Sequence, residues 1–168
     1  MAGIPNCGAS LVADLASSVG PAGMVGGQQL DLDNEGQELF EGLIKDIHLL
    51  KTANLIAASM SIGARIAGIE KHKIPLIKSA GISLGMAFQA ADDILDVMSD
   101  SATLGKTVGK DEKSDKPTWV RFEGLDKARH RMLDYGQSSI NQMQALLPNN
   151  DSSSKLLKLM EKLWIRDR

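Results

Sequence analysis

Three aspartates, Asp92, Asp93 and Asp96, interrupt an otherwise apolar stretch of the chain. Residues 82–98 show no strand alternation and no proline, so they predict a helix with Asp92 and Asp96 four residues apart on one face. Like charges at this spacing repel by about 0.2–0.5 kcal/mol, and negative charge near a helix C-terminus costs roughly 0.3–1 kcal/mol. A hard cation such as Mg²⁺, which bridges carboxylates to substrate phosphates, would offset both costs. The pattern favours a Mg²⁺–phosphate site, and a solvated acidic stripe on a core helix is the alternative.

Lys51 and Thr52 place a cation and a hydroxyl within a helical pattern of apolar residues. A lysine in this context commonly extends along apolar surface to reach water. If Lys51 points into a cavity instead, it is a point charge suited to a phosphate group. Phe88 and Gln89 lie one turn before the aspartates and share their face.

A glycine pair precedes Gln28 and Asp31, which are three residues apart and therefore lie on one face of a predicted helix. Each glycine inside a helix lowers the stability of the helix by roughly 1 kcal/mol relative to alanine. The presence of two glycines there therefore calls for a structural or functional explanation. Close helix packing, including packing across a subunit interface, is one explanation. A ligand that approaches the backbone is the other.

A basic loop follows the aspartates and contains Lys106, Asp111 and Lys116. Its Gly-Lys-Thr sequence resembles the end of a phosphate-binding P-loop. That interpretation fails because Asp100 stands where the P-loop pattern requires glycine, and because no strand is predicted before it. The remaining interpretation is a mobile basic loop that folds over a metal-bound anion, with a solvated charged loop as the alternative.

The elements that must position these residues are predicted to be helices, since Ala, Leu, Ile, Met, Lys and Glu dominate the periodic stretches and aromatic residues are few. We expect an all-α helical bundle in one domain spanning 1–168. The long polar stretch 100–117 is the longest predicted loop. Helices are expected at about 10–31, 38–67, 72–99, 124–147 and 152–165.

Composition narrows the setting of the protein. The 168 residues carry a net charge of −2, which gives no general case for nucleic-acid binding. The single cysteine, Cys7, cannot form an internal disulfide, and no cysteine or histidine spacing resembles a zinc site. No secretory signal is evident and no segment reaches eighteen uncharged apolar residues, so we expect a cytoplasmic protein without a membrane span.

Taken in order, these motifs resemble the short-chain trans-prenyl diphosphate synthases, of the farnesyl diphosphate synthase type. The resemblance runs from about Gly20 to the C-terminus and rests on five ordered motifs with matching separations. It implies the C-terminal half of the isoprenoid synthase fold and usually a homodimer. It also implies a prenyltransferase reaction of isoprenoid biosynthesis, in which Mg²⁺ ionises an allylic diphosphate and isopentenyl diphosphate attacks the carbocation. The motifs that carry it lie at 26–32, 51–52, 87–89, 92–96 and 105–111.

The resemblance also implies a role for each matching residue. Asp92 would be a metal ligand, and Asp93 and Asp96 would complete an aspartate-rich motif with Gln89 beside it. Phe88 would shield the carbocation and wall the second substrate pocket. The remaining matches form two groups: lysines that neutralise the departing diphosphate, and residues that line the cavity or organise it and the loop. They are Lys51, Lys106 and Lys116 in the first group and Gln28, Asp31, Thr52 and Asp111 in the second.

The family pattern also has parts that this sequence lacks. Family members carry a first aspartate-rich motif on an earlier helix, followed by arginines, and a Gly-Lys and a histidine that bind isopentenyl diphosphate. Without them, two of three metal positions would lack ligands. We therefore expect a prenyltransferase by descent that is inactive alone. The alternative is a non-catalytic helical subunit or remnant that binds Mg²⁺–diphosphate or completes a partner.

Overall fold

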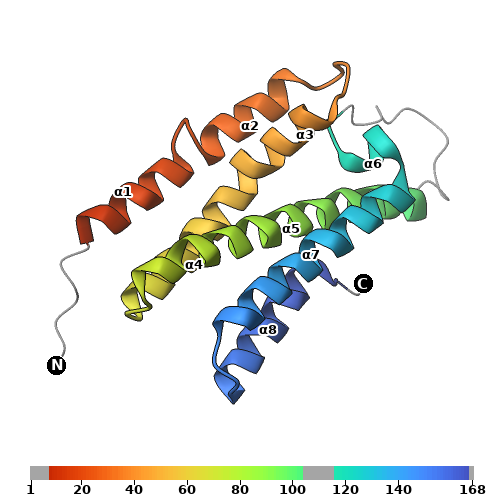
Figure 1. Cartoon of the computed structure of the whole chain (residues 1–168). Helices are drawn as coiled ribbons and strands as arrows, with labels where there is room; N and C mark the ends of the chain where they lie inside the picture. Colours follow the sequence, from red (N-terminus) through yellow and green to blue (C-terminus); the bar gives the residue numbers. More distant parts are fainter. Residues whose placement is uncertain (1–7, 104–115, 167–168) are drawn as a thin grey trace.

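Helices make up all regular structure in residues 8–103 and 116–166, the ranges that the computed structural model describes (Figure 1). The all-α prediction is therefore confirmed for these ranges. The α-helices are α1 (Gly8–Val19), α2 (Met24–Asp33), α3 (Glu41–His48), α4 (Asn54–Ile66), α5 (Ile74–Thr103), α6 (Trp119–Glu123), α7 (Leu125–Leu146) and α8 (Asp151–Trp164). A π-helical segment, η1 (Leu49–Ala53), joins α3 to α4, and a short 3₁₀ turn, η2 (Lys71–Lys73), precedes α5.

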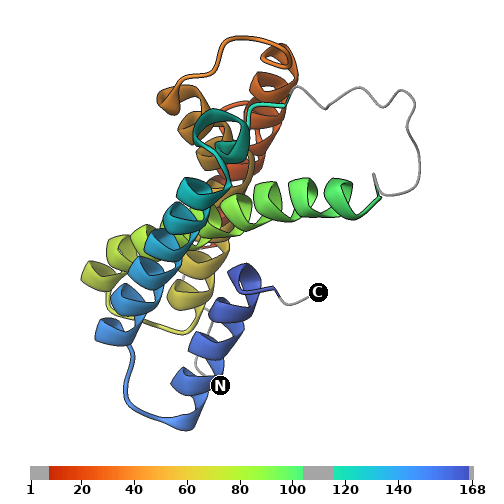
Figure 2. The ribbon, with the colours of Figure 1, turned by 90° about the vertical axis from the view of Figure 1, so that its right-hand side faces the viewer.

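Helix α5 is the central element, with α4 packed on one side and α7 on another (Figures 1 and 2). Small residues set how closely α5 approaches its neighbours. A Cβ atom added to Gly85 would lie 2.3 Å from the Cα of Ala53, and one added to Gly81 would lie 2.6 Å from the Cα of Ala57. These glycines allow the backbone of α5 to rest directly on η1 and α4.

Two apolar clusters hold the bundle together. One joins α5 to α7 and α8, and its members include Leu84, Ile140, Met160 and Trp164. The other joins α5 to α3, η1, α6 and α7, and its members include Ile44, Met86, Ile94 and Trp119. The short helix α6 was not predicted. It begins at the N-cap Thr118, whose side-chain oxygen accepts from the backbone N–H of Arg121.

The prediction of one helix over 10–31 is wrong, because the chain breaks between α1 and α2. Pro21 lies in the break and has no backbone N–H to continue the first helix. The chain then turns tightly at two glycines that follow Pro21. A Cβ atom on Gly23 would lie 2.2 Å from the carbonyl oxygen of Ser18, and one on Gly26 would lie 1.9 Å from that of Pro21.

The other predicted helices are confirmed with shifted ends. The 38–67 segment is continuous from Glu41 but contains the unpredicted π-helical segment η1. The predicted loop at 100–117 begins too early, since α5 continues to Thr103. By length and composition, the segment Lys71–Ser99 could cross a membrane, and half of its most apolar stretch is buried inside the molecule. Core helices pass the same test, so the expected lack of a span stays a prediction.

Candidate active site

The three aspartates of α5 border one cavity of about 130 Å³ together with four other predicted site residues. This cavity, called the aspartate cavity below, lies where α2, η1, α5 and the segment before α6 meet. The predicted site residues that line it are Asp31, Lys51, Gln89, Asp92, Asp93, Asp96 and Lys116. Residues far apart in sequence are therefore brought together around one acidic and basic cavity.

Asp93 differs from its two neighbours because its side chain is buried. One of its carboxyl oxygens accepts a 2.9 Å hydrogen bond from the backbone N–H of Trp119 and lies 3.5 Å from Nε2 of His48. Burial raises the pKa of Asp93 to about 8, and burial lowers the pKa of His48 to about 3. Both side chains are therefore largely neutral near pH 7. Asp93 thus helps to fix the start of α6 against α5.

Lys51 forms an ion pair with Asp31, with its Nζ donating to a carboxyl oxygen at 2.6 Å. Lys51 lies in η1, and π-helical segments inside helices are frequent at functional sites. Helix α2 packs closely against η1, because a Cβ atom on Gly27 would lie 2.2 Å from the backbone nitrogen of Lys51. Of the two explanations left open for the glycine pair, close helix packing therefore accounts for Gly27.

Thr52 connects η1 to α5. Its hydroxyl donates a 2.8 Å hydrogen bond to the side-chain oxygen of Gln89. Gln28 borders a neighbouring cavity of about 430 Å³, which Lys51 and Thr52 also line. The predicted residues of α2 and η1 thus lie between two adjacent cavities.

Phe88 and Asp92 both contact Arg166 near the C-terminus. The guanidinium carbon of Arg166 lies 4.1 Å from the centre of the Phe88 ring, and Nη1 donates to Oδ1 of Asp92 at 3.0 Å. Asp96 is exposed, one turn further along α5. Two predicted site residues, Lys106 and Asp111, lie outside the described residues.

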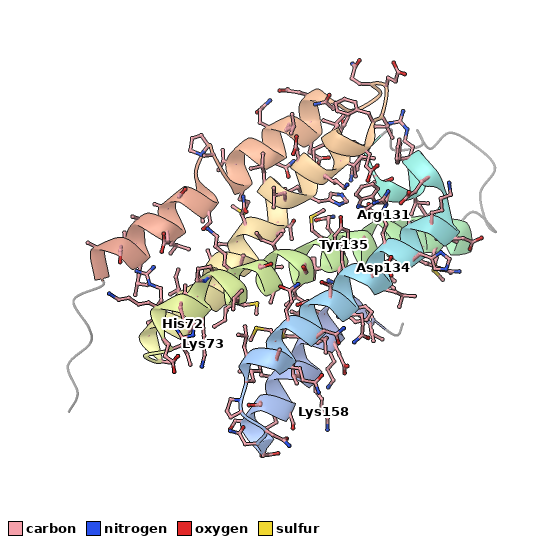
Figure 3. All side chains as sticks on the ribbon, viewed as in Figure 1. His72, Lys73, Arg131, Asp134, Tyr135 and Lys158 are labelled. Carbon is pink, nitrogen blue, oxygen red and sulfur yellow. The ribbon has the colours of Figure 1, made fainter. Side chains whose placement is uncertain are left out.

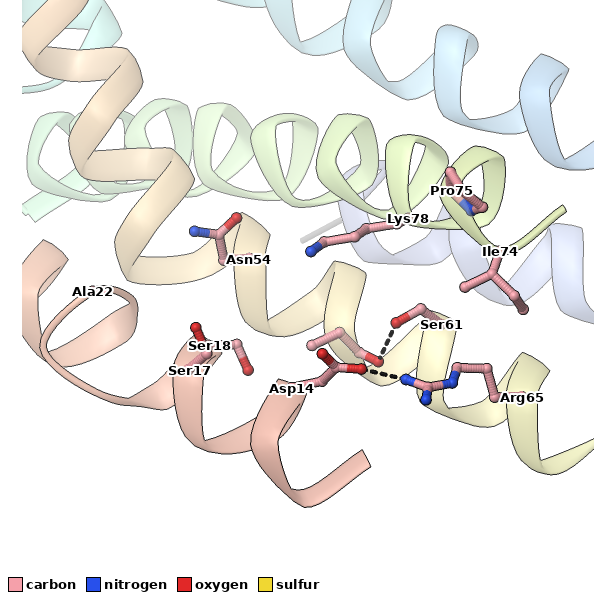
Figure 4. A pocket seen from close by; sticks show the side chains of 11 residues that line it. Asp14, Ser17, Ser18, Ala22, Asn54, Ser61, Arg65, Ile74, Pro75 and Lys78 are labelled. Atoms are coloured by element: carbon pink, nitrogen blue, oxygen red, sulfur yellow. Dashed lines mark hydrogen bonds and ion pairs between the residues drawn. The ribbon is translucent and has the colours of Figure 1, made fainter. Parts of the chain in front are cut away.

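Another cavity, of about 360 Å³ and lined mostly by polar residues, lies between α1, α4 and the start of α5 (Figure 4). An ion pair between Asp14 and Arg65 lies at its edge, and the side chain of Lys78 points toward it from α5. None of the predicted site residues lines this cavity. Of the predicted site residues that the structure describes, all but Phe88 line the aspartate cavity or its neighbour.

Comparison with known proteins decides the family. The profile of the polyprenyl synthetase family matches residues 10–156. The chain belongs to the polyprenyl synthetase family. Farnesyl diphosphate synthase of Escherichia coli is 38% identical over 160 residues, which are 95% of this chain and 54% of that protein. The large subunit 1 of a heterodimeric geranylgeranyl pyrophosphate synthase from Arabidopsis thaliana is 42% identical over 121 residues, which are 70% of this chain and 33% of that protein.

Solved structures of this family share the fold. A geranyltransferase from Helicobacter pylori, complexed with magnesium and isoprenyl diphosphate, superposes with a TM-score of 0.77 at 29% identity. The match covers 95% of this chain and 52% of that one. The chain spans about half the length of the Escherichia coli and Helicobacter pylori relatives and a third of the Arabidopsis subunit.

The donor atoms around the aspartate cavity fit the Mg²⁺ that this family implies. Asp92 and Asp96 supply carboxylate oxygens one helical turn apart, and Mg²⁺ usually binds one or two carboxylates plus waters and substrate phosphates. No three histidine, cysteine or acidic side chains within the described residues form a ready-made metal cage. The arrangement therefore suits a metal that arrives with a phosphate ligand, and the roles of the three aspartates stay predictions.

Sequence reasoning missed three residues at this site. His48 and Trp119 contact Asp93, and Arg166 contacts Asp92. Arg131 supports Trp119 from α7, because its guanidinium carbon lies 4.1 Å from the centre of a Trp119 ring (Figure 3). Each of the three missed residues lies at least 26 residues away in the sequence from the aspartate that it contacts. Only the fold brings them together, so no local sequence pattern marks them.

Proposed function

We propose that this chain forms the diphosphate-binding part of a Mg²⁺-dependent prenyltransferase site. The reaction is the condensation of isopentenyl diphosphate with an allylic diphosphate, as the family membership suggests. One observation carries the proposal: lysine and aspartate side chains from four segments of the chain border a single cavity. A diphosphate leaving group needs positive charge in a site with little water. Lysines supply part of this charge, and carboxylates that hold a metal ion supply the rest.

Each residue has a distinct part in this proposal. Asp92 and Asp96 hold the metal, and Asp93 orients the end of the motif from its buried position. Bound Mg²⁺ would supply charge neutralisation for the departing diphosphate. Lys51 and Lys116 add fixed positive charge, with Asp31 holding the Lys51 ammonium in place at 2.6 Å.

The other assigned residues line or close the site. Gln89 lines the aspartate cavity and accepts from Thr52 at 2.8 Å. Thr52 and Gln28 line the adjoining cavity, close to the reacting carbons. Phe88 shields the carbocation. Lys106 and Asp111 belong to the proposal through the family resemblance alone.

We further propose that the chain alone does not turn over substrate. The sequence contains one aspartate-rich motif, so two of three metal positions would lack ligands. A cytoplasmic location, without a membrane span or a nucleic-acid partner, completes this proposal.

A second candidate function is a helical subunit that binds Mg²⁺–diphosphate without catalysis or completes a partner. Apolar side chains exposed on α1 and α2 favour such a contact, and they also suit a homodimer. Val12 and Val25 are 67% and 53% exposed, and Leu15 and Leu32 lie on the same faces. The Arabidopsis relative is a heterodimer subunit by name. Sedimentation of the purified chain distinguishes a monomer from a dimer.

Calorimetric titration with Mg²⁺ and inorganic diphosphate tests the site. We expect Asp92→Ala to weaken diphosphate binding at least about tenfold, in line with the loss of a metal ligand or its support. Asp134→Ala removes an exposed acid from α7 and serves as the matched control (Figure 3). Undiminished binding by Asp92→Ala would reject the site. Incorporation of labelled isopentenyl diphosphate by the purified chain then tests the proposed lack of turnover, since any extension of the allylic substrate would overturn it.

A further inference from the structure

Arg166 lies just beyond the end of α8 and reaches back to α5. Its Nη1 donates to Oδ1 of Asp92 at 3.0 Å, and its Nε donates to the carbonyl oxygen of Leu163 at 3.0 Å. Its guanidinium also lies over the ring of Phe88. Three contacts therefore hold one cation against the carboxylate that is proposed to bind the metal.

The packing of α8 sets the position of Arg166. Trp164, the last residue of α8, is 5% exposed and packs on α7, where a Cβ atom on Gly136 would lie 2.3 Å from its ring. Ile165 then leaves the helix with an extended backbone. The chain is thus anchored two residues before Arg166, which shortens the range over which this side chain can move.

A guanidinium and a divalent cation compete for the same carboxylate oxygen. Arginine keeps its charge at every physiological pH, so loss of a proton cannot release it from the carboxylate. The Arg166 and Asp92 side chains are 29% and 44% exposed, so the pair is partly screened by water. Lys51, which also lines this cavity, is held by Asp31 instead.

We propose that Arg166 is the counter-ion of Asp92 in the metal-free protein and that the metal displaces it on binding. The displacement rests on the proposed function, because it assumes that Asp92 binds the metal. Arg166 is then a positioning residue: it holds the Asp92 carboxylate and weakens metal binding. For a partly exposed ion pair, we expect a weakening of about two- to fivefold.

Titration with Mn²⁺, followed by electron paramagnetic resonance, tests the competition in the full chain. Arg166→Gln is expected to bind Mn²⁺ about two- to fivefold more tightly than the wild type. Lys158→Gln removes the same charge from an exposed site on α8 and controls for long-range electrostatics (Figure 3). Equal or weaker Mn²⁺ binding by Arg166→Gln, relative to Lys158→Gln, would overturn the displacement.

The ion pair itself is tested without metal, by the arginine Nε–Hε signals in nuclear magnetic resonance spectra. Asp92→Asn is expected to shift the Arg166 signal, and addition of Mg²⁺ with inorganic diphosphate to the wild type is expected to move it in the same direction. An Arg166 signal that does not respond to Asp92→Asn would refute the ion pair, whether or not metal binds. If neither the wild type nor Arg166→Gln binds Mn²⁺, the proposed metal site and the displacement both fail.

Discussion

The two parts of α5, before and after Ala91, differ in what surrounds them. The earlier part packs closely on its neighbours, with Gly81 and Gly85 against the backbone of α4 and η1. The later part carries the acids and exposes apolar side chains, since Val97 and Met98 are 40% and 36% exposed. The close-packed part fixes the rotation of the helix, and the later part leaves the Asp92 and Asp96 carboxylates accessible to water.

The same contrast separates neighbouring residues within the aspartate motif. Successive residues on an α-helix point about 100° apart, so Asp92 and Asp93 face different surroundings. Asp93 turns toward His48 and the backbone of Trp119, whereas Asp92 and Asp96 remain partly open to water. The metal roles predicted for all three acids stay predictions, and burial leads us to expect that Asp93 serves packing while Asp92 and Asp96 bind the metal.

The largest expected effect comes from enlarging the close-packed part. Gly85→Ala places a Cβ atom 2.3 Å from the Cα of Ala53, so the backbone must shift. We expect the free energy of unfolding to fall by roughly 2–3 kcal/mol, measured by urea denaturation.

Gly63→Ala is the matched control, because a Cβ atom at this exposed site on α4 would meet nothing within 4 Å. It should raise the free energy of unfolding by about 0.5–1 kcal/mol, since alanine favours the helix over glycine. Equal effects of the two substitutions would contradict the account of close packing.

A smaller effect is expected within the aspartate motif. Asp93→Ala leaves the buried N–H of Trp119 without its acceptor and should lower the free energy of unfolding by about 1–2 kcal/mol. Asp96→Ala should change it by no more than about 0.5 kcal/mol, because this side chain is exposed. Thermal and urea melts of both variants check the difference. A larger loss for Asp96→Ala would reverse the assigned roles.

The sequence predicts the helical class, the long helix α5 and the shared face of Asp92 and Asp96, because these follow from local periodicity. It also selects Lys51, Asp31 and Gln89, which the fold brings to one cavity. The helix predicted at 10–31 runs through Pro21, where the structure has a break between α1 and α2. The small residues Gly81 and Gly85 did not allow the sequence to predict how closely α5 approaches η1 and α4.

Other features have no local signal at all. The π-helical segment η1 depends on how α2 and α5 pack against it, and the buried state of Asp93 depends on Trp119. Arg166 meets Asp92 across 74 residues of sequence. Such contacts become visible only when the packing of α6 and α8 on the bundle is known.

The most direct test of the central claim, that the aspartate cavity binds Mg²⁺–diphosphate, is a thermal melt of the chain with and without Mg²⁺ and inorganic diphosphate. Ligand at a hundred times its dissociation constant adds about 2.7 kcal/mol to the free energy of unfolding. For a chain of this size, the midpoint should rise by roughly 5–10 °C, and Asp92→Ala should remove the rise. A cooperative melt with an unchanged midpoint would contradict the claim.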